Sequence, residues 1–594
     1  MSISGRARAV LLVLAATFIV LAVHAVTGFK TLSDLGGDND SLLRLVQIRD
    51  LLAGQGWFDP HQYRMGPEGG FAMHWSRLVD APVAAIMLAM SALGLAPAGA
   101  ETVAQVVWPT LLLALTLFFI LRMARLFGGE KAVLPAAVLG GSALYFLGIF
   151  APAALDHHNV QLLLACACLY LLLRARQERA AALPAGVCAA LMLAVGMETA
   201  PVVAAVGTCV AALFLFAPAH ERLVARNFGL GFAAASTAVF FATIAPSAWA
   251  QAQCDAFSVV QFVLAALSGL GLALVTTIPA AAGTFGRRLL ALGLVGFLVA
   301  LAAVLAFPQC LASPYAGLDP RLTSLWLDHV SEARSLFALA SEDPAVLAAR
   351  YATPLLALAL MAMRLRAGGW RREDSLVGAV LAVSFLVSIW QVRGSTFSIS
   401  LAVVPLSAWI AGWRARAEAS SSPGVSLRMV AVWLLSINAS WTGAAAAASV
   451  AVEGNRTADA DAASASRCTR ASDYALLATQ PATMVLAISN LGSPILAYSG
   501  HHVFSGPYHR NVAGNLLALD ALMGTPAEAE RIVERHHVGL VALCRGNSES
   551  RLLSEQAPVS LLAGVMEGAV PGWLELLPES AGQPLEIYRV RPDH

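Results

Sequence analysis

Long apolar runs separated by short polar loops dominate about three quarters of the chain. A helix that crosses a bilayer needs about 20 mainly apolar residues, and runs of this length predict about thirteen crossings. They lie at residues 9–26, 105–121, 132–150, 159–173, 182–197, 200–217, 228–247, 257–278, 289–307, 347–363, 374–391, 396–412 and 429–450. No small-residue cleavage site separates the first run from the polar loop after it, so it is interpreted as a transmembrane helix and not as a signal peptide.

Basic residues in the loops predict how the chain is threaded. The positive-inside rule assigns arginine-rich loops to the cytoplasm. Clusters fall between alternate pairs of runs, at Arg122, Arg125 and Lys131, at Arg174, Arg176 and Arg179, at Arg222 and Arg226, at Arg287 and Arg288, at Arg364, Arg366, Arg371 and Arg372, and at Arg414, Arg416 and Arg428. The pattern requires that residues 83–95 do not cross, and this run of about 13 residues suits a re-entrant or interfacial helix. The N-terminus is therefore predicted in the cytoplasm and the long loops 28–104 and 307–346 outside it.

Composition supports a polytopic α-helical membrane protein. Hydrophobic residues make up 58% of the 594 residues and charged residues 13%, which departs from the soluble average. The formal net charge is only +1. Because nucleic-acid binding requires a concentrated basic face, no nucleic-acid partner is expected.

The composition changes near residue 451, which predicts two domains, 1–450 in the membrane and 451–594 outside it. The second part mixes polar residues with short β-like and helical runs. Alternation of this kind predicts a small α/β domain with a largely parallel or mixed sheet. The predicted strands are 483–488, 494–498, 538–543 and 585–590, and the predicted helices are 515–523 and 527–536.

Two polar islands interrupt the apolar pattern and indicate a metal site. Asp38 and Asp40 lie in the polar loop 36–82, and Asp156 and His158 lie between two apolar runs. Such groups beside a membrane are costly unless they are paired or bind a cation, and carboxylate oxygens suit hard divalent cations. A solvated glycine-rich turn is the alternative for the first island, and an ordinary polar loop is the alternative for the second.

Cysteine positions agree with an oxidising location for the external parts. Cys468 and Cys544 both fall in the external domain, and Cys254 and Cys310 both fall in external loops. Two disulfides are therefore expected in a periplasm-like compartment, and Cys468 is expected to pair with Cys544. The other cysteines lie within apolar runs, where they act as small packing residues: Cys166, Cys168, Cys188 and Cys209.

Three sets of residues, in this order along the chain, carry a family resemblance. The first external loop contains Asp40-Ser-Leu-Leu-Arg, Trp57-Phe-Asp-Pro-His-Gln-Tyr-Arg and Met73-His-Trp-Ser-Arg-Leu-Val-Asp-Ala-Pro. The second set is Asp156-His-His-Asn-Val, and the third is Val330-Ser331-Glu332. They resemble the motifs of oligosaccharyltransferase catalytic subunits, especially the archaeal ones, which are GT-C membrane glycosyltransferases.

The resemblance implies metal-dependent glycosyl transfer. It assigns a divalent cation, Mn²⁺ or Mg²⁺, to Asp40, Asp156 and His158, and the mixed oxygen and nitrogen set favours Mn²⁺. It makes Asp40 and Glu332 catalytic, with Glu332 orienting or activating the acceptor. Arg393 resembles a family arginine that contacts the donor pyrophosphate, since guanidinium binds phosphate through paired hydrogen bonds. A snorkelling arginine at the interface is the alternative for Arg393.

The same resemblance implies the partners and the setting of the reaction. The donor is a polyprenyl-(di)phosphate-linked sugar, the acceptor is a protein or a glycan, and the outcome is inverting. A lid is expected in loop 307–346, and the protein is expected in a bacterial inner membrane with its C-terminal domain in the periplasm. The accessory candidates are Asp38, His157, Glu198 and His329; for Glu198, a helix-end carboxylate at the interface is the alternative.

The resemblance stops before the C-terminal domain. The family's Trp-Trp-Asp-Tyr-Gly motif, which reads the hydroxyl residue of the Asn-x-Ser/Thr acceptor, does not occur in the sequence. A polar cluster from His501 to Asn511 occupies a comparable region without matching it. Two alternatives stay open: a transferase that modifies lipopolysaccharide, polysaccharide or lipid, and a transporter or flippase for lipid-linked sugar.

Overall fold

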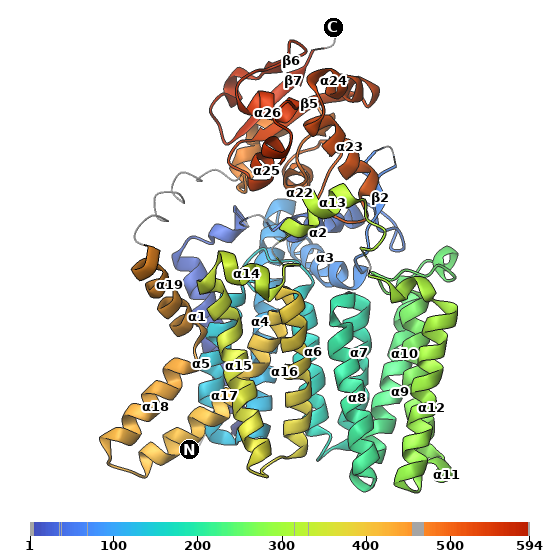
Figure 1. The fold of residues 1–594 in the computed structure, drawn as a ribbon, viewed down its shortest axis with the longest axis vertical. Helices are drawn as coiled ribbons and strands as arrows, with labels where there is room; N and C mark the ends of the chain where they lie inside the picture. Colours follow the sequence, from blue (N-terminus) through green and yellow to red (C-terminus); the bar gives the residue numbers. More distant parts are fainter. Residues whose placement is uncertain are drawn as a thin grey trace.

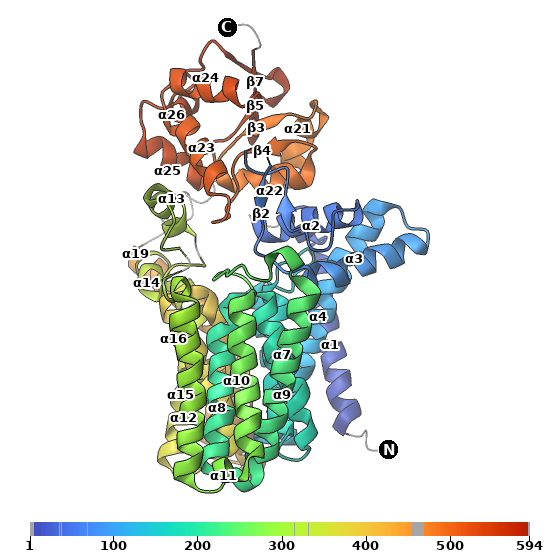
Figure 2. The same ribbon diagram turned by 90° about the vertical axis from the view of Figure 1, so that its right-hand side faces the viewer.

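A bundle of long helices carries a small α/β domain on one end (Figure 1). The structure is a computed structural model that describes residues 5–34, 36, 38–67, 69–313, 315–330, 332–453 and 468–591. The N-terminus lies toward the opposite end of the bundle from the C-terminal domain, in both views (Figures 1 and 2). The expected domain boundary near residue 451 borders residues 454–467, which lie outside the described ranges, so this boundary stays a prediction.

Apolar helices of membrane-spanning length form the bundle. Among the described residues, ten helices are long and apolar enough to cross a membrane, and the bent pair α18 and α19 would make eleven. The bundle helices are α1 (Gly5–Val26), α4 (Pro97–Gly128), α5 (Val133–Leu147), α6 (His158–Arg174), α7 (Ala182–Val195), α8 (Ala200–Phe216), α9 (Pro218–Thr243), α10 (Val259–Thr277), α12 (Phe285–Ala306), α15 (Pro344–Arg366), α16 (Arg372–Trp390), α17 (Ser395–Glu418), α18 (Pro423–Leu435) and α19 (Asn438–Glu453). Because α6 and α7 are shorter apolar helices of the same bundle, thirteen crossings stay a prediction.

Two bundle segments differ from the predicted runs. The run predicted at 429–450 is two helices, α18 and α19, bent by 82°. At the break, Asn438 donates to the carbonyl of Ala349 at 2.7 Å and to Thr353 Oγ1 at 3.0 Å, so the bend gives a buried amide its partners. Helix α9 begins at Pro218, well before the predicted start at 228, and this places Arg222 and Arg226 on the helix.

Glycines allow the helices around α9 to approach closely. A Cβ atom on Gly186 of α7 would lie 2.2 Å from the carbonyl oxygen of Phe228, and one on Gly229 of α9 would lie 2.4 Å from that of Gly269 in α10. Small residues at helix crossings let backbones pack directly in membrane bundles. This part of the bundle is therefore held by close backbone contact.

Both long loops lie at the end of the bundle that carries the C-terminal domain (Figure 2). The predicted interfacial run is helix α3, which begins earlier than expected and lies across the end of the bundle (Figures 1 and 2). The elements of the first loop are α2 (Asn39–Leu52), β1 (His61–Gln62), β2 (Phe71–Ala72) and α3 (Arg77–Ala92). The second loop contains α13 (Pro320–Leu325) and α14 (Leu336–Glu342), and the short helix α11 (Pro279–Ala282) lies at the opposite end.

A buried ion network ties α2 to α3. Arg44 Nη1 lies 2.7 Å from Asp80 Oδ1, and Arg77 Nη1 lies 3.1 Å from Asp80 Oδ2. The Arg44 guanidinium also stacks over the ring of Trp75, 4.5 Å from its centroid. Because a buried charge that loses its partner is costly, this network fixes the helix that carries Asp40.

The C-terminal domain is built on a mixed five-stranded sheet. Its strand order is β4-β3-β5-β7-β6, with β4, β3 and β5 parallel and β7 antiparallel to both of its neighbours. The strands are β3 (Met484–Leu486), β4 (His502–Val503), β5 (Val538–Cys544), β6 (Leu574–Leu576) and β7 (Leu585–Val590). The helices are α21 (Ala475–Thr479), α22 (Ser489–Tyr498), α23 (Val512–Met523), α24 (Pro526–Arg535), α25 (Ser548–Gln556) and α26 (Leu561–Met566).

One predicted strand is wrong. Residues 494–498 form the last part of helix α22, where Ile495 is buried against the sheet core. A short apolar run does not distinguish a buried strand from a buried helix. The helix packs against α2, so the segment has an apolar surface to cover that the local sequence does not reveal.

The first long loop and the C-terminal domain share one hydrophobic core. Leu43 and Met65 from the loop belong to the same buried cluster as Val485 and Leu540 of the sheet. The backbone N–H of Gly66 donates to Val503 O at 2.8 Å, and Val503 N–H donates to the carbonyl of Arg64 at 2.9 Å. The domain therefore rests on the loop through backbone hydrogen bonds as well as through apolar contact.

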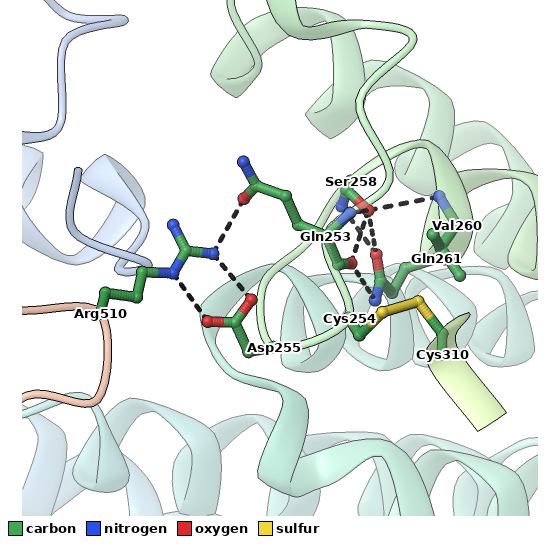
Figure 3. Close-up of a disulfide and its surroundings, with 8 residues drawn as sticks. All are labelled: Gln253, Cys254, Asp255, Ser258, Val260, Gln261, Cys310 and Arg510. Carbon is green, nitrogen blue, oxygen red and sulfur yellow. Dashed lines mark hydrogen bonds and ion pairs between the residues drawn. A yellow bond between two sulfur atoms is a disulfide. The ribbon is translucent and has the colours of Figure 1, made fainter. Parts of the chain in front are cut away.

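Two disulfides lie in the C-terminal domain and at the end of the bundle that carries it. Cys468 is bonded to Cys544 inside the C-terminal domain, and Cys254 is bonded to Cys310. Figure 3 shows the second bond linking the loop before α10 to the segment after α12. The four other cysteines, Cys166, Cys168, Cys188 and Cys209, are free thiols within the bundle.

Candidate active site

Short junctions at the domain end of the bundle bring together side chains from distant parts of the sequence. The loop before α6 supplies Asp156, the 3-10 turn Met197–Thr199 supplies Glu198, and the 3-10 turn Val392–Gly394 supplies Arg393. The first turn of α2 and the second long loop add further carboxylates. All of these elements lie between the helix bundle and the C-terminal domain (Figure 1).

Asp156 and the two following histidines form the most compact cluster. His157 Nδ1 lies 2.5 Å from Asp156 Oδ1, and His158 Nδ1 contacts Asp156 Oδ2. Ligand atoms from all three residues lie within 4.8 Å of one another. Burial alone would raise the pKa of Asp156, but the charges of His157 and His158 and their hydrogen bonds hold it well below its usual range.

Glu198 contacts this cluster from the opposite side. Its Oε1 lies 3.1 Å from His157 Nε2, and its Oε2 accepts a hydrogen bond from Gln161 Nε2 at 3.0 Å. Burial alone would lower the pKa of His157, but Asp156 and Glu198 raise it to about 9. Burial acts in the same direction on His158, and Asp156 raises the pKa of His158 as well, to about 10, so the contacts and not the pKa values separate the two histidines. Each ring nitrogen of His157 lies beside a carboxylate, which suits it to orienting Asp156 and Glu198, whereas Nε2 of His158 has no hydrogen-bond partner among the described residues.

Asp38 caps helix α2 and connects it to the Asp156 loop. It accepts hydrogen bonds from the Ser41 backbone N–H at 3.0 Å and from the Ser41 hydroxyl at 2.6 Å. The same hydroxyl oxygen accepts from the N–H groups of Leu155 and Asp156 at 2.9 and 3.1 Å. Burial and the Asp156 carboxylate raise the pKa of Asp38 to about 6. Both oxygens of Asp38 already accept hydrogen bonds, so Asp38 acts with Ser41 to hold the first turn of α2 against the loop that carries Asp156.

Asp40 points into the same region with its carboxylate uncommitted. No hydrogen bond or ion pair joins this carboxylate to another residue in the described part of the chain. Burial, followed by the charges of Asp156, Asp38 and Glu332, raises its pKa well above the usual range. Several carboxylates therefore share one poorly solvated space, which a divalent cation would stabilise.

Glu332 lies at the open side of the cluster. Its Oε2 is 4.0 Å from His158 Nε2, and its side chain is 60% exposed, which leaves it accessible to an incoming substrate. The Glu332 carbonyl accepts from the backbone N–H of Arg393 at 3.2 Å. Ser331 lies outside the described residues. His329 is exposed, and in the described ranges it makes no side-chain contact with the cluster.

Arg393 directs its guanidinium toward Glu198. Its Nη1 lies 4.0 Å from Glu198 Oε1, and its Nε donates to Gln391 Oε1 at 3.0 Å. The side chain is 19% exposed. The guanidinium therefore has donors left for an anion beside the carboxylate cluster.

The donor set fits a divalent cation. His158 Nε2 is a buried nitrogen that has no hydrogen-bond partner among the described residues, although it lies near Glu332. Together with the uncommitted carboxylate of Asp40, it offers the nitrogen and oxygen ligands that Mn²⁺ or Mg²⁺ accepts. Among the described residues, the ligand atoms that lie within 4.8 Å of one another here are those of Asp156, His157 and His158, and Asp40 is not part of that group.

A second group of possible metal ligands is engaged in ion pairs instead. Ligand atoms of His74, Asp255 and His509 also lie within 4.8 Å of one another. Both oxygens of Asp255 accept from Arg510 at 2.7 Å (Figure 3). One of these oxygens also lies 2.7 Å from His509 Nε2. Because the carboxylate is already neutralised, this group is an ion-paired contact between the domain and the bundle.

The sequence analysis missed the residues by which the C-terminal domain reaches this site. The Tyr508 hydroxyl donates to the carbonyl of Asn39, next to Asp40, at 3.0 Å, and it lies 2.8 Å from Ser493 Oγ. Tyr508 also packs edge-on against Trp75, whose ring lies 6.1 Å from that of His157. The polar run around Tyr508 was the signal in the sequence, but a local run does not show that Tyr508 contacts the first turn of α2.

Comparison with solved structures finds several with a similar fold. Archaeal oligosaccharyltransferase AglB from Archaeoglobus fulgidus, in complex with an inhibitory peptide and a dolichol-phosphate, has a TM-score of 0.66 at 15% identity and covers 100% of this chain and 75% of that chain. The same organism's oligosaccharyltransferase tethered with an acceptor peptide gives 0.63 at 15% identity, covering 96% and 73%. Its complex with Zn and sulfate gives 0.61 at 13% identity, covering 96% and 72%.

The chain therefore has an oligosaccharyltransferase-like GT-C fold, as the motifs predicted. No protein-family model matches the sequence. A search of curated proteins gives no match either.

Proposed function

We propose that the chain is a membrane glycosyltransferase that moves a sugar or oligosaccharide from a polyprenyl-(di)phosphate donor to an acceptor. The observation that carries the proposal is the convergence of Asp40, Asp156, His158, Glu332 and Arg393 at one end of the bundle. The fold supports it, because structures with this fold have been solved with a dolichol-phosphate and with peptides. The proposed setting is a bacterial inner membrane with the site and the C-terminal domain in the periplasm.

Asp40, Asp156 and His158 would hold the cation. When bound, a divalent cation supplies Lewis-acid stabilisation of the negative charge that develops on the departing diphosphate. His157 and Glu198 position Asp156 and Arg393 through the contacts described above. Asp38 and Ser41 keep the first turn of α2 against the Asp156 loop.

Glu332 and Arg393 would act on the two substrates. The exposed Glu332 carboxylate accepts a hydrogen bond or a proton from the acceptor nucleophile. The Arg393 guanidinium donates to phosphate oxygens of the donor, which places the anomeric carbon near the acceptor. Because the Glu332 carbonyl is hydrogen-bonded to the Arg393 backbone, closing the second loop would order both groups together.

The acceptor is the least constrained part of the proposal. A sequon-reading Trp-Trp-Asp-Tyr-Gly motif does not occur in the sequence, which favours a lipopolysaccharide, polysaccharide or lipid acceptor as the second candidate. A transporter for lipid-linked sugar is less well supported. Transport sites usually lie midway along broken helices, whereas the described acids of this site lie in junctions at one end of the bundle.

The test uses the purified full-length chain with lipid-linked sugars extracted from bacterial membranes. Release of polyprenyl (di)phosphate together with labelled product is expected, and chelation should abolish it until Mn²⁺ or Mg²⁺ is restored. Glu332→Gln should lose turnover, whereas Asp328→Asn should not, since Asp328 is an exposed acid in the same loop. Movement of the lipid-linked sugar across the membrane without cleavage of the bond between sugar and phosphate would replace the enzyme by a transporter.

A further inference from the structure

A cavity of about 550 Å³ lies at the end of the bundle opposite the candidate active site. It is formed where α9 begins and α10 ends, close to α11 (Figure 2). The described residues that line it include three arginines and a histidine and no acid: Arg179, His220, Arg222 and Arg226. It is a concave basic site at the predicted level of the membrane surface.

The arginines of this cavity differ from their neighbours in having no acidic partner. Nearby, Arg174 pairs with Glu178, and Arg176 pairs with Glu373. Glu221, beside Arg222 in sequence, points to Arg372 with a 2.6 Å contact. Within the described ranges, no carboxylate pairs with Arg179, Arg222 or Arg226. A positive-inside bias alone explains arginines at this end of the bundle, but not their convergence on one cavity without counter-charges.

Two further features make the cavity suited to an anion. The Nε of Arg226 is a buried donor that has no hydrogen-bond partner among the described residues. Helix α9 begins at Pro218 with no side-chain cap, so the partial positive charge of its first turn lies at the cavity. Proline has no N–H, and the N–H groups of His220 and Glu221 donate to the carbonyl of Ala217 at 3.2 and 3.1 Å, so the helix contributes charge more than free donors. Arg222 donates to the carbonyls of Thr276 and Thr277 at 2.6 and 3.4 Å, so it offsets the negative end of α10 and stays at the cavity rim.

We infer that this cavity binds a phosphate group, as carried by the headgroup of an anionic phospholipid or by free phosphate. Arginine donors match phosphate oxygens in geometry and charge. Basic cavities between transmembrane helices at the membrane surface are typical binding sites for anionic headgroups. The ligand would hold α7, α9 and α10 together at the end of the bundle away from the chemistry.

The test uses the purified full-length chain in phosphatidylcholine nanodiscs or micelles. The probe is a short-chain phosphatidylglycerol, compared with short-chain phosphatidylcholine and with inorganic phosphate, and the readout is native mass spectrometry with a binding titration. Phosphatidylglycerol should bind roughly tenfold or more tightly than phosphatidylcholine. Competition by inorganic phosphate would identify free phosphate as a ligand too, and no competition would identify the lipid headgroup as the source.

Variants decide whether the cavity is responsible. Arg226→Gln should weaken phosphatidylglycerol binding roughly tenfold, and Arg179→Gln combined with Arg222→Gln should weaken it further. Arg287→Gln is the matched control, because Arg287 is an exposed arginine at the same end that does not line the cavity. Monodispersity and thermal stability check that each variant folds. Equal binding of the two lipids, or unchanged binding by Arg226→Gln and by the double variant, would overturn the inference.

Discussion

The bundle and the C-terminal domain contribute to the candidate site in different ways. The bundle supplies Asp156, Glu198 and Arg393 from short junctions, each of which connects two consecutive apolar helices. The domain supplies Tyr508 from an irregular segment after β4, and its hydroxyl donates to the Asn39 carbonyl in the first turn of α2. Arg510 of the same segment pairs with Asp255 and anchors the domain to the bundle outside the site. The bundle carries the groups proposed for chemistry, and the domain positions the loop that completes them.

This comparison predicts that variants in the two regions fail differently. Losing a carboxylate from the bundle side should reduce turnover with little change in stability, because the group faces a space between elements and not a packed core. Losing a domain contact should reduce stability or change the apparent affinity first. The largest effects are expected where a cation would bind.

Asp156→Asn should reduce turnover and Mn²⁺ binding about 100-fold or more, because the amide keeps the shape but removes the charge and a ligand oxygen. Asp40→Asn should behave alike, and the double variant should cost much less than the two single losses combined. Metal titration and initial rates measure both effects.

Asp38→Asn is the control for this set. Its oxygens cap α2 and hold Ser41, so its activity loss should be milder and its effect on stability of the order of 1 kcal/mol. Equal and additive losses from all three changes, or turnover that survives exhaustive chelation, would contradict a shared cation.

The disulfide of the C-terminal domain should contribute mainly to stability. The bond from Cys468 to Cys544 spans 76 residues, and native disulfides are typically worth about 2–4 kcal/mol. Paired Cys468→Ser and Cys544→Ser changes should lower the domain's melting temperature while leaving metal binding by the bundle intact. Peptide mapping without reductant should recover the two cysteines linked in the wild type; two free thiols in periplasmic protein would contradict it.

Two ion pairs between the domain and the rest of the chain provide a matched comparison. Arg510 and Asp255 are mostly buried, at 18% and 19% side-chain exposure, whereas Arg321 and Asp520 are 51% and 47% exposed. Asp255→Asn should therefore cost about 1.5 kcal/mol or more in stability, and Asp520→Asn should cost less than about 1 kcal/mol. Chemical denaturation of both variants in one detergent measures the difference.

Acid should weaken the same contact in the wild type. Burial alone would raise the pKa of Asp255, but hydrogen bonds from His509 and Arg510 hold it well below its usual range. A lowered folded-state pKa contributes stability above the unfolded pKa of about 3.9, and this stability is lost as the pH falls below that value. The wild type should therefore lose more stability than Asp255→Asn below about pH 4; parallel pH curves would contradict the assignment.

Local signals explain what the sequence could predict. Asp40 and Asp156 lie in polar islands next to apolar runs, and each is visible without knowing its neighbours in space. Glu332 was predicted only through the resemblance of Val330-Ser331-Glu332 to a family motif. The contact between Asp255 and Arg510 joins residues that are 255 positions apart, so no local pattern could reveal it. The same holds for α22, where a short apolar run was assigned to a strand because its packing against α2 lies outside the segment.

The shared core sets a second limit on prediction from sequence. Met65 of the first loop is fully buried against Val503 of the domain, although a composition change near residue 451 separates the two parts along the chain. Apolar residues in the polar first loop were therefore a signal of docking. Their number was too small to stand out against the membrane segments.

Tyr508→Phe should give a small effect on activity and the sharpest test of how the domain acts on the site. The change removes the hydroxyl that donates to the Asn39 carbonyl and contacts Ser493, but it keeps the ring against Trp75. One lost hydrogen bond should cost about 1 kcal/mol, which corresponds to a roughly fivefold change. If Tyr508 positions the first turn of α2, Mn²⁺ affinity and kcat should fall together, with donor KM nearly unchanged.

Ser499→Ala is the matched control for this variant. It removes a hydroxyl in the same domain that donates to the carbonyl of Ile495 and accepts from the backbone N–H of His501. Within the described ranges, this hydroxyl contacts no residue of the first loop. An equal fall in kcat for both variants would mean that the domain acts through its stability alone. A fall in kcat for Tyr508→Phe alone, with its melting temperature nearly unchanged, would assign the positioning of Asp40 to the Tyr508 hydroxyl. Both variants lose a hydroxyl that makes hydrogen bonds, but only the Tyr508 hydroxyl reaches α2.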